Sequence, residues 1–325
     1  MIVLLEPDVF VEAASADLMV LLWLGATGRH RIAVLDEKAP AYIAWLGQQD
    51  EITRSEWQRV VGESVLQQVR EPSYHQVWIA ARGDSTWSYP NPILTVADAI
   101  DLLLRPYRVL VENGFSDRAF LLSMCDRATR EFLEEWCSRE WVEIEHCGGN
   151  DHLEKRAKEA RKHAGTRMRH SAIFDGDGMR PGISSTKSRG IRDLCYPDVH
   201  YHQLERRAIE NYLPRAAMER WVKLAHGQAR RERAAQVAAV FSLSVDQRAH
   251  YNMKEGFAGD VPNAHRAGDL FNGLAAETLR LLDEGLDKKI AKLYQDDAVL
   301  YHELEKTPQI ESVQAFAREI VERIR

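Results

Sequence analysis

The sequence predicts an α/β protein with a central parallel β-sheet. Apolar runs at 107–111, 142–146 and 171–174 are typical of buried strands, and polar helical segments separate them. Strands that alternate with helices of these lengths form parallel units, in which ligands bind beyond the carboxyl ends of the strands. An α/β unit is expected before this sheet and a mainly helical region after it. The predicted domains are 1–92, 93–215 and 216–325.

The elements of the first unit follow from short apolar runs and a turn-rich segment. Strands are expected at 2–5, 19–24, 32–35 and 77–80, and helices at 40–46 and 55–69. Pro40 suits the first position of its helix, where the missing N–H costs nothing. The stretch 82–92 is rich in Gly, Ser and Pro, which places the first domain boundary there.

The rest of the chain is expected to be mostly helical between its strands. Helices are predicted at 96–104, 116–123, 131–140 and 151–163 around the central strands, and a further short strand at 199–202. The C-terminal region is expected to contain helices at 204–213, 216–225, 228–241 and 310–324. Apolar spacing within 264–292 suits one or two amphipathic helices.

Composition excludes several classes of protein. The 325 residues are 45% hydrophobic and 28% charged, which excludes a collagen-like, low-complexity or wholly disordered chain. The apolar run at 18–24 is far shorter than the roughly 20 residues of a membrane helix, and no basic segment precedes it as in a signal peptide. Four widely spaced cysteines fit a reducing compartment. We therefore expect a cytoplasmic protein without membrane association.

The net charge of −6 conceals an uneven distribution. Residues 151–236 contain 19 Lys and Arg against 11 Asp and Glu, whereas the rest of the chain is acidic. A basic middle is compatible with a polyanion partner, although solvated helix faces give the same pattern.

Acidic residues and a glycine turn follow the three predicted central strands. They are Glu112 and Asp117 after the first strand, Gly148 and Gly149 after the second, and Asp175 and Asp177 after the third. Because the carboxyl ends of neighbouring parallel strands meet at one edge of a sheet, these acids are expected to converge and to favour a bound cation. A few hard oxygen ligands are typical of Mg²⁺ or Mn²⁺, which activate water and stabilise phosphoryl transfer.

This order of motifs resembles the TOPRIM domain of topoisomerases, primases and nucleases. In that domain a strand ends in Glu, a glycine turn follows the next strand, and a later strand ends in Asp-x-Asp, as at Glu112, Gly148 and Asp175/Asp177. The stretch LERRAIENYLP is similar to the IENYL helix of stand-alone and ATPase-linked TOPRIM nucleases, including the OLD (overcoming lysogenization defect) family. The resemblance covers roughly residues 105–215.

The resemblance implies a TOPRIM-like, Rossmann-like central sheet and a metal-dependent endonuclease that cleaves nucleic-acid phosphodiester bonds. It maps a further metal ligand onto Glu210, and Lys254 corresponds by position alone to a downstream lysine of OLD-like nucleases. The spacing from Glu112 to Asp117 is one residue longer than in many TOPRIM nucleases, so Asp117 matches their motif less well than Glu112 does. The implied catalytic residues are Glu112, Asp175, Asp177 and Lys254, and the implied ligands of Mg²⁺ or Mn²⁺ are Glu112, Asp117, Asp175, Asp177 and Glu210.

The same resemblance implies a nucleic-acid substrate, with DNA favoured over RNA, and a setting in anti-phage defence. The chain has no GxxxxGK[ST] motif, so a separate ATPase or another defence protein is an expected partner, and self-association fits as well. The basic segment supplies candidate contacts to the phosphate backbone at Arg180, Lys187, Arg189 and Arg207.

Two other functions stay open at this point. The string IFDGDG also resembles the opening motif of haloacid-dehalogenase-like phosphatases, in which the first Asp, here Asp175, is a nucleophile and the second, Asp177, a general acid. That interpretation leaves Glu112 and the IENYL stretch without a role. The third alternative is a non-catalytic nucleic-acid-binding or regulatory protein with a degenerate metal site.

Overall fold

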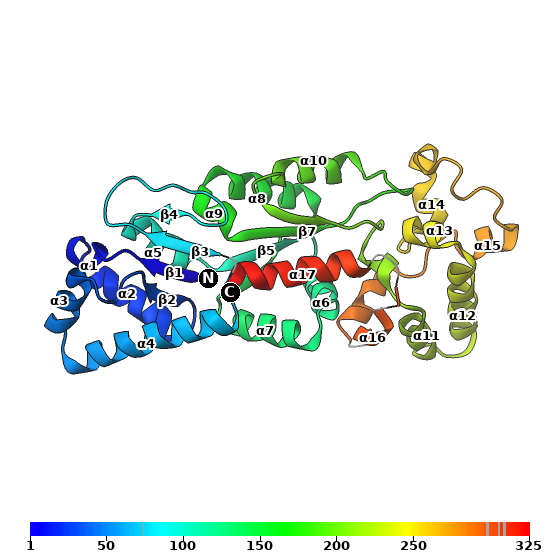
Figure 1. Cartoon of the computed structure of the whole chain (residues 1–325). Coiled ribbons are helices and arrows are strands. Elements are labelled where there is room, and N and C mark those ends of the chain that lie inside the picture. Colours follow the sequence, from blue (N-terminus) through cyan, green and yellow to red (C-terminus); the bar gives the residue numbers. More distant parts are fainter. Residues whose placement is uncertain (74, 297–298, 305, 308–309) are drawn as a thin grey trace.

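Two four-stranded parallel sheets form the framework of the protein. The computed structural model describes residues 1–73, 75–296, 299–304, 306–307 and 310–325. The first sheet lies in the N-terminal part and the second follows it along the molecule (Figure 1). Most helices that follow the second sheet lie at the far end, but the last one returns to the centre (Figure 1). The α/β class is therefore confirmed. Among the residues that the structure describes, no helix is both long and apolar enough to cross a membrane.

The first sheet has the strand order β2-β1-β3-β4. Its strands are β1 (Ile2–Leu5), β2 (Arg31–Val34), β3 (Gln76–Ile79) and β4 (Ile93–Leu94). Its helices are α1 (Val9–Glu12), α2 (Ser15–Ala26), α3 (Pro40–Gln48), α4 (Glu51–Arg70) and α5 (Val96–Leu104). Pro40 begins α3 as predicted.

Two sequence expectations differ from this arrangement. The strand predicted at 19–24 is wrong, because this run lies inside α2, where Leu18 and Leu21 are fully buried. Every residue of this run is apolar, including Trp23, which is 51% exposed, so no polar face separates helix from strand in the sequence. The loop at 82–92 also does not end the first core, since Leu102 and Leu103 of α5 are buried in it. The first unit therefore extends to the end of α5.

The second sheet has the strand order β6-β5-β7-β8, with every pair parallel. Its strands are β5 (Tyr107–Val111), β6 (Val142–His146), β7 (His170–Phe174) and β8 (His200–Gln203). All three predicted central strands and the short fourth strand are thereby confirmed. Because β5 lies between β6 and β7, the residues that follow these three strands meet at one edge of the sheet.

Helices cover both faces of the second sheet. They are α6 (Gly114–Ser123), α7 (Arg127–Ser138), α8 (Asn150–Lys162), α9 (Ala164–Met168) and α10 (Thr186–Cys195). Apolar side chains of α8 and α10 pack on one face. Those of α6, α7 and the C-terminal helix pack on the other, so the two groups lie above and below the sheet in Figure 1.

The region after the second sheet is less regular than its sequence suggests. Its elements are η1 (Ile209–Tyr212), α11 (Arg215–Lys223), α12 (Gly227–Ser242), α13 (Val245–His250), α14 (Gly256–Asp260), η2 (Val261–Ala267), α15 (Ala276–Leu281), η3 (Ile290–Tyr294), α16 (Tyr301–Leu304) and α17 (Ile310–Ile324). The helix predicted at 204–213 is wrong, since only the 3₁₀ turn η1 forms there. The predicted helical stretch 264–292 is broken into short pieces, because Gly268, Gly273 and Gly285 adopt positive φ angles that end a helix.

The last helix returns to the centre of the molecule. Ile320 and Ile324 of α17 are fully buried in the core that α17 shares with α6 and α7. The ammonium group of Met1 donates a 2.9 Å hydrogen bond to the carbonyl of Ile324, so both chain termini lie side by side (Figure 1). The α17 helix thus ties the first sheet to the second.

Replacing Ile320 by alanine is expected to lower the free energy of unfolding by about 2–5 kcal/mol, because it leaves a cavity in a fully buried position. Urea unfolding of Ile320→Ala and of the control Glu322→Ala, which alters an exposed residue of the same helix, measures the difference. A loss no larger than that of the control would contradict the placement of α17 in the core.

Candidate acidic site

Four carboxylates and the ammonium of Lys254 lie together in the wall of a single cavity of about 580 Å³. Glu112 follows β5 and Asp175 follows the adjacent strand β7, so the sheet itself brings these two together. Three further residues of the cavity wall come from other elements: Asp117 from α6, Glu210 from η1 and Lys254 from the turn before α14. The structure thus assembles five of the six predicted catalytic and metal-binding residues around one space.

The glycine turn holds the backbone of Glu112 in place. The N–H groups of Gly148 and Gly149 each donate a 3.1 Å hydrogen bond to the carbonyl oxygen of Glu112. Both glycines have positive φ angles, 75° and 109°, which residues with a side chain rarely adopt. The turn predicted after the second strand therefore positions an acid of the first.

Asp117 reaches the cavity from the first turn of α6. Its Oδ2 accepts a 2.7 Å hydrogen bond from the N–H of Asn113, the residue before the helix. This bond folds the side chain back toward the strand end that carries Glu112, and the carboxylate also faces the positive end of the helix dipole. The longer spacing noted in the sequence still brings Asp117 to the site.

The two acids of the Asp-x-Asp motif, Asp175 and Asp177, lie in different surroundings. Asp175 lines the cavity, whereas Asp177 is not part of its wall. Asp177 adopts a left-handed φ of 48°, and its carboxylate accepts a 3.3 Å hydrogen bond from the side-chain amide of Asn150. Asp177 still acts on the site through its charge, because it contributes to the raised pKa of Glu112.

Backbone pairing brings Glu210 beside Asp175. The N–H of Asp177 donates to the carbonyl of Arg207 at 2.8 Å, so the Asp-x-Asp loop runs next to the segment that leads into η1. A Cβ at Gly176 would lie 2.5 Å from the carbonyl oxygen of Leu204, which explains the glycine at this close approach. Glu210 is 2% exposed and sits in the first turn of η1.

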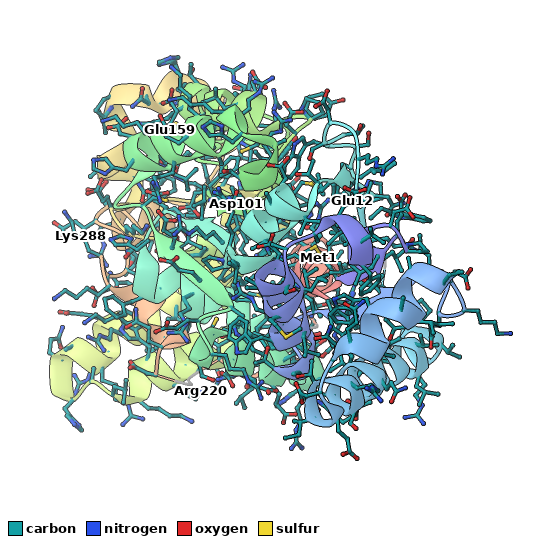
Figure 2. All side chains as sticks on the ribbon, turned by 90° about the vertical axis from the view of Figure 1, so that its left-hand side faces the viewer. Met1, Glu12, Asp101, Glu159, Arg220 and Lys288 are labelled. Carbon is teal, nitrogen blue, oxygen red and sulfur yellow. The ribbon has the colours of Figure 1, made fainter. Side chains whose placement is uncertain are left out.

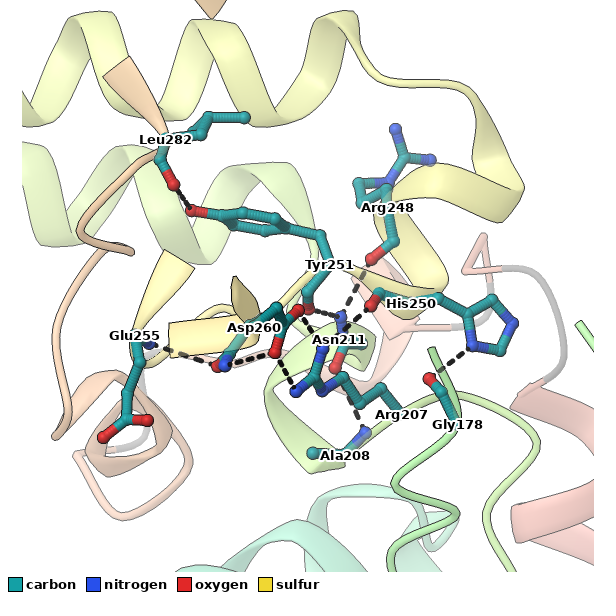
Figure 3. A network of polar contacts seen from close by, with 11 residues as sticks. Gly178, Arg207, Ala208, Asn211, Arg248, His250, Tyr251, Glu255, Asp260 and Leu282 are labelled. Atoms are coloured by element: carbon teal, nitrogen blue, oxygen red, sulfur yellow. Dashed lines mark hydrogen bonds and ion pairs between the residues drawn. The ribbon is translucent and has the colours of Figure 1, made fainter. Parts of the chain in front are cut away.

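The asparagine of the IENYL stretch positions the turn that carries Lys254. Its side-chain amide donates to the carbonyls of Arg248 and Tyr251, both at 2.9 Å, and its Oδ1 accepts from the N–H of Ala208 (Figure 3). Asn211 is buried, so these bonds satisfy a polar group that would otherwise be costly.

Arg207 holds the far side of the same turn. Its guanidinium binds both carboxylate oxygens of Asp260 at 2.6 and 2.7 Å (Figure 3). The side-chain amide of Asn252 donates to the same carboxylate at 3.1 Å. A bidentate pair of this kind fixes orientation as well as distance. Hydrogen bonds from Asn211 to residues before the turn and from Arg207 to Asp260 after it therefore hold the turn that carries Lys254.

Burial and mutual repulsion raise the pKa values of Glu112, Asp117 and Asp175. Burial, together with the charges of Asp177 and Asp117, raises the pKa of Glu112 to about 7. Burial likewise raises the pKa of Asp117 to about 6. For Asp175, burial and the charge of Glu112 raise the pKa well above its ordinary value.

Lys254 supplies positive charge at the centre of this cluster. Its ammonium lies 3.0 Å from Oε1 of Glu210. Burial works against the charged form, yet Glu210 and Asp175 outweigh it and hold the pKa of Lys254 above its usual value. Lys254 was assigned from the sequence by position alone, and the structure places it among the acids.

One oxygen of the cluster lacks a partner. Oε2 of Glu112 is buried and accepts no hydrogen bond in the described part of the chain. In the same part of the chain, no three Asp, Glu, His or Cys side chains are arranged to hold a metal ion together.

The predicted nucleic-acid contacts do not gather at this cavity. Arg207 is committed to Asp260, and Lys187 forms an ion pair with Asp151 beside a second cavity near the glycine turn. Arg180 and Arg189 are exposed, and neither lines the acidic cavity. Arg207, predicted as a contact to the phosphate backbone, has a guanidinium that is largely buried in an ion pair with Asp260.

A different set of residues borders the cavity. Lys288, Lys289 and Lys292 line its rim, and Figure 2 shows Lys288 projecting at the edge of the molecule. Phe115, which follows the first strand of the site, is 84% exposed at the same opening. The lysine run at 288–292 was visible in the sequence, but it lay in a stretch interpreted as an amphipathic helix.

Comparison with known proteins adds no relative. No protein-family model, curated protein or solved structure matches this chain. The site is therefore interpreted from its own geometry and chemistry.

Replacing Asp175 by asparagine is expected to stabilise the metal-free protein, because it removes one of several buried negative charges at similar volume. We expect the free energy of unfolding in EDTA to rise by about 0.5–2 kcal/mol. Chemical unfolding of Asp175→Asn is compared with Asp84→Asn, which changes an exposed acid outside the cavity. A destabilised Asp175→Asn protein would show that the acids are not under electrostatic strain.

Proposed function

We propose that this protein is a metal-dependent phosphodiesterase that cleaves nucleic acid at the acidic cavity, on a TOPRIM-like central sheet. The observation that carries the proposal is the convergence of Glu112, Asp117, Asp175 and Glu210 with Lys254 beyond the ends of adjacent parallel strands. Acids crowded in this way are unfavourable by themselves, so a cluster of them is best explained by a function that needs it.

The donor set of the cavity fits Mg²⁺ or Mn²⁺. Glu112, Asp175 and Glu210 offer hard oxygen atoms, and the unpartnered Oε2 of Glu112 has capacity for a cation. These three residues would hold the metal, with Asp117 beside them. A bound divalent ion would supply an activated water and neutralise charge on the phosphate. Since Glu210 already binds Lys254, the metal has to compete with an ammonium for that carboxylate.

Lys254 and the rim suit a phosphodiester substrate. The ammonium of Lys254 faces the cavity among the acids, where it would stabilise negative charge on a phosphate oxygen. Lys289 and Lys292 extend the positive charge outward along the rim, which fits a chain of phosphates. Phe115 presents an exposed ring on which a base would stack.

The position of Asp177 argues against the phosphatase alternative. In that mechanism the first Asp attacks phosphorus and the second protonates the leaving group, so both must face one cavity. Asp177 instead bonds to Asn150 outside the cavity wall. The rim lysines also suit an extended polyanion better than a small phosphomonoester.

The biological setting belongs to the same proposal. We infer DNA as the favoured substrate, in anti-phage defence inside the cell, with a separate ATPase or another defence protein as partner. The IENYL stretch and its order after Asp-x-Asp support this setting, because they resemble ATPase-linked TOPRIM nucleases.

Incubation of the purified protein with plasmid, linear DNA and RNA tests the activity. We expect cleavage that depends on Mg²⁺ or Mn²⁺ and falls at least about 10²-fold in Glu112→Gln and Asp175→Asn, because each removes a metal ligand. The matched control is Glu205→Gln, which changes an exposed acid just before the IENYL stretch. Equal cleavage by the wild type and both cavity variants would refute the assigned site.

Metal binding is tested separately from cleavage. Mn²⁺ at saturating concentration is expected to raise the melting temperature of the wild type but not of Asp175→Asn, because a ligand stabilises only the state that binds it.

Hydrolysis of p-nitrophenyl phosphate that requires Asp175 but not Glu112 would instead support the phosphatase.

Removing the rim charges is expected to weaken DNA binding without affecting the metal. In the Asp175→Asn background with EDTA, we expect Lys289→Gln/Lys292→Gln to lower DNA affinity about tenfold. The slope of log affinity against log salt should fall in magnitude by about 2, one for each lost phosphate contact. Fluorescence anisotropy measures both, with the exposed Lys223→Gln as control. An unchanged salt slope would show that DNA does not follow this rim.

A further inference from the structure

Another cavity lies between the first unit and the second sheet, apart from both the acidic site and the cavity near the glycine turn. It has a volume of about 380 Å³, within the size range of small-molecule sites, and such sites favour boundaries between structural units. Four separate segments build it: the loop with Trp87 and Tyr89, helix α9, the start of β8 and the last turn of α17. None of the residues that line the acidic cavity takes part.

The charge of this cavity is positive. Arg167 and Arg323 line it, and within the described residues neither guanidinium forms an ion pair with a carboxylate. Arg167 donates to the carbonyl of Arg161, and the guanidinium of Arg323 lies 4.7 Å from the centre of the Tyr89 ring. Asp198 is the acid of the cavity wall, and Arg161 already binds it at 3.1 Å.

Two histidines near the cavity, His75 and His200, are uncharged. Burial, followed by the charge of Arg323, lowers the pKa of His75 to about 3 and that of His200 to about 4. Both rings are therefore neutral at pH 7 and add no charge to that of the arginines. Glu319 is engaged by His200 at 2.8 Å.

The remaining wall is aromatic. Trp87, Tyr89 and Tyr201 all line the cavity, together with Met168. Trp87 is held against the backbone of α9, since a Cβ at Gly165 would lie 3.2 Å from its ring. Tyr201 stacks on Phe174 with ring centres 6.2 Å apart. Flat, fixed rings beside unpaired guanidinium groups suit a planar aromatic ligand that carries an anion.

We propose that this cavity binds a nucleotide, with its base against the aromatic wall and its phosphate at Arg167 and Arg323. The proposal is independent of the acidic site and of the proposed nuclease activity. The same chemistry could come from a free nucleotide or from the 5′-phosphorylated end of a nucleic-acid strand.

Calorimetric titration of the full chain in EDTA tests the proposal. AMP, GMP, CMP and UMP represent a free nucleotide as the ligand. A 5′-phosphorylated tetranucleotide, compared with its unphosphorylated form, represents the end of a nucleic-acid strand. We expect at least one phosphorylated probe to bind, and adenosine and ribose 5-phosphate to bind at least tenfold more weakly than AMP if AMP is that probe. Binding of the 5′-phosphorylated tetranucleotide alone would show that the ligand is the end of a nucleic-acid strand.

Variants locate the binding. Arg323→Gln and Arg167→Gln should each weaken it at least tenfold, whereas Arg325→Gln, on the same helix end but lining another cavity, should change it less than twofold. Asp175→Asn should leave it unchanged, because that residue belongs to the acidic site. Melting temperatures confirm that each variant is folded.

Three results would overturn the proposal. They are the absence of binding by every probe, equal binding by the wild type and both arginine variants, and loss of binding in Asp175→Asn or Arg325→Gln. The last would assign the nucleotide to a different cavity. Because the titration contains no divalent metal and measures no cleavage, its failure leaves the proposed nuclease activity to its own tests.

Discussion

Repulsion among buried carboxylates is the constraint on which the site depends. Glu112, Asp175 and Glu210 lie close enough that burial and mutual charge favour protonation of the first two, and the ammonium of Lys254 offsets part of this cost. A chain would separate such groups unless its backbone prevented it. Here the parallel pairing of β5 with β7 prevents it for two of them, because both strands end at one edge.

The IENYL stretch completes the site by linking three parts of the chain. Its glutamate faces the cavity, its asparagine holds the turn before Lys254, and its tyrosine is fully buried against Phe120 of α6. Asn211 and Tyr212 bond to backbone groups and Glu210 binds the ammonium of Lys254, so the short segment is held in place without a regular helix. The region after the second sheet is therefore part of the site, since it supplies the lysine and the rim.

The success of the sequence predictions followed the regularity of the elements. The central strands, α5 and α17 have clear apolar periods and sharp ends, and they were located correctly. The run at 19–24 was misassigned because all of its residues are apolar, including the exposed Trp23, so the sequence shows no polar face of a helix. The stretch 264–292 was misassigned because glycines with positive φ interrupt an otherwise helical spacing. The spacing of apolar residues indicates which positions are buried, but it does not indicate the backbone angles at the glycines that interrupt a helix.

For the site, the sequence by itself determined which acids follow which strands, and parallel pairing made the meeting of Glu112 with Asp175 predictable. Only the tertiary structure decided which cations stand near them. Arg207 was predicted to bind phosphate because it lies in a basic segment, but its guanidinium forms an ion pair with Asp260. Lys254 and the lysines at 288–292 lie far along the chain from the strands and nevertheless line the cavity. The reason is physical: a charge acts through distance in space and through its competing partners, and neither is encoded in local spacing.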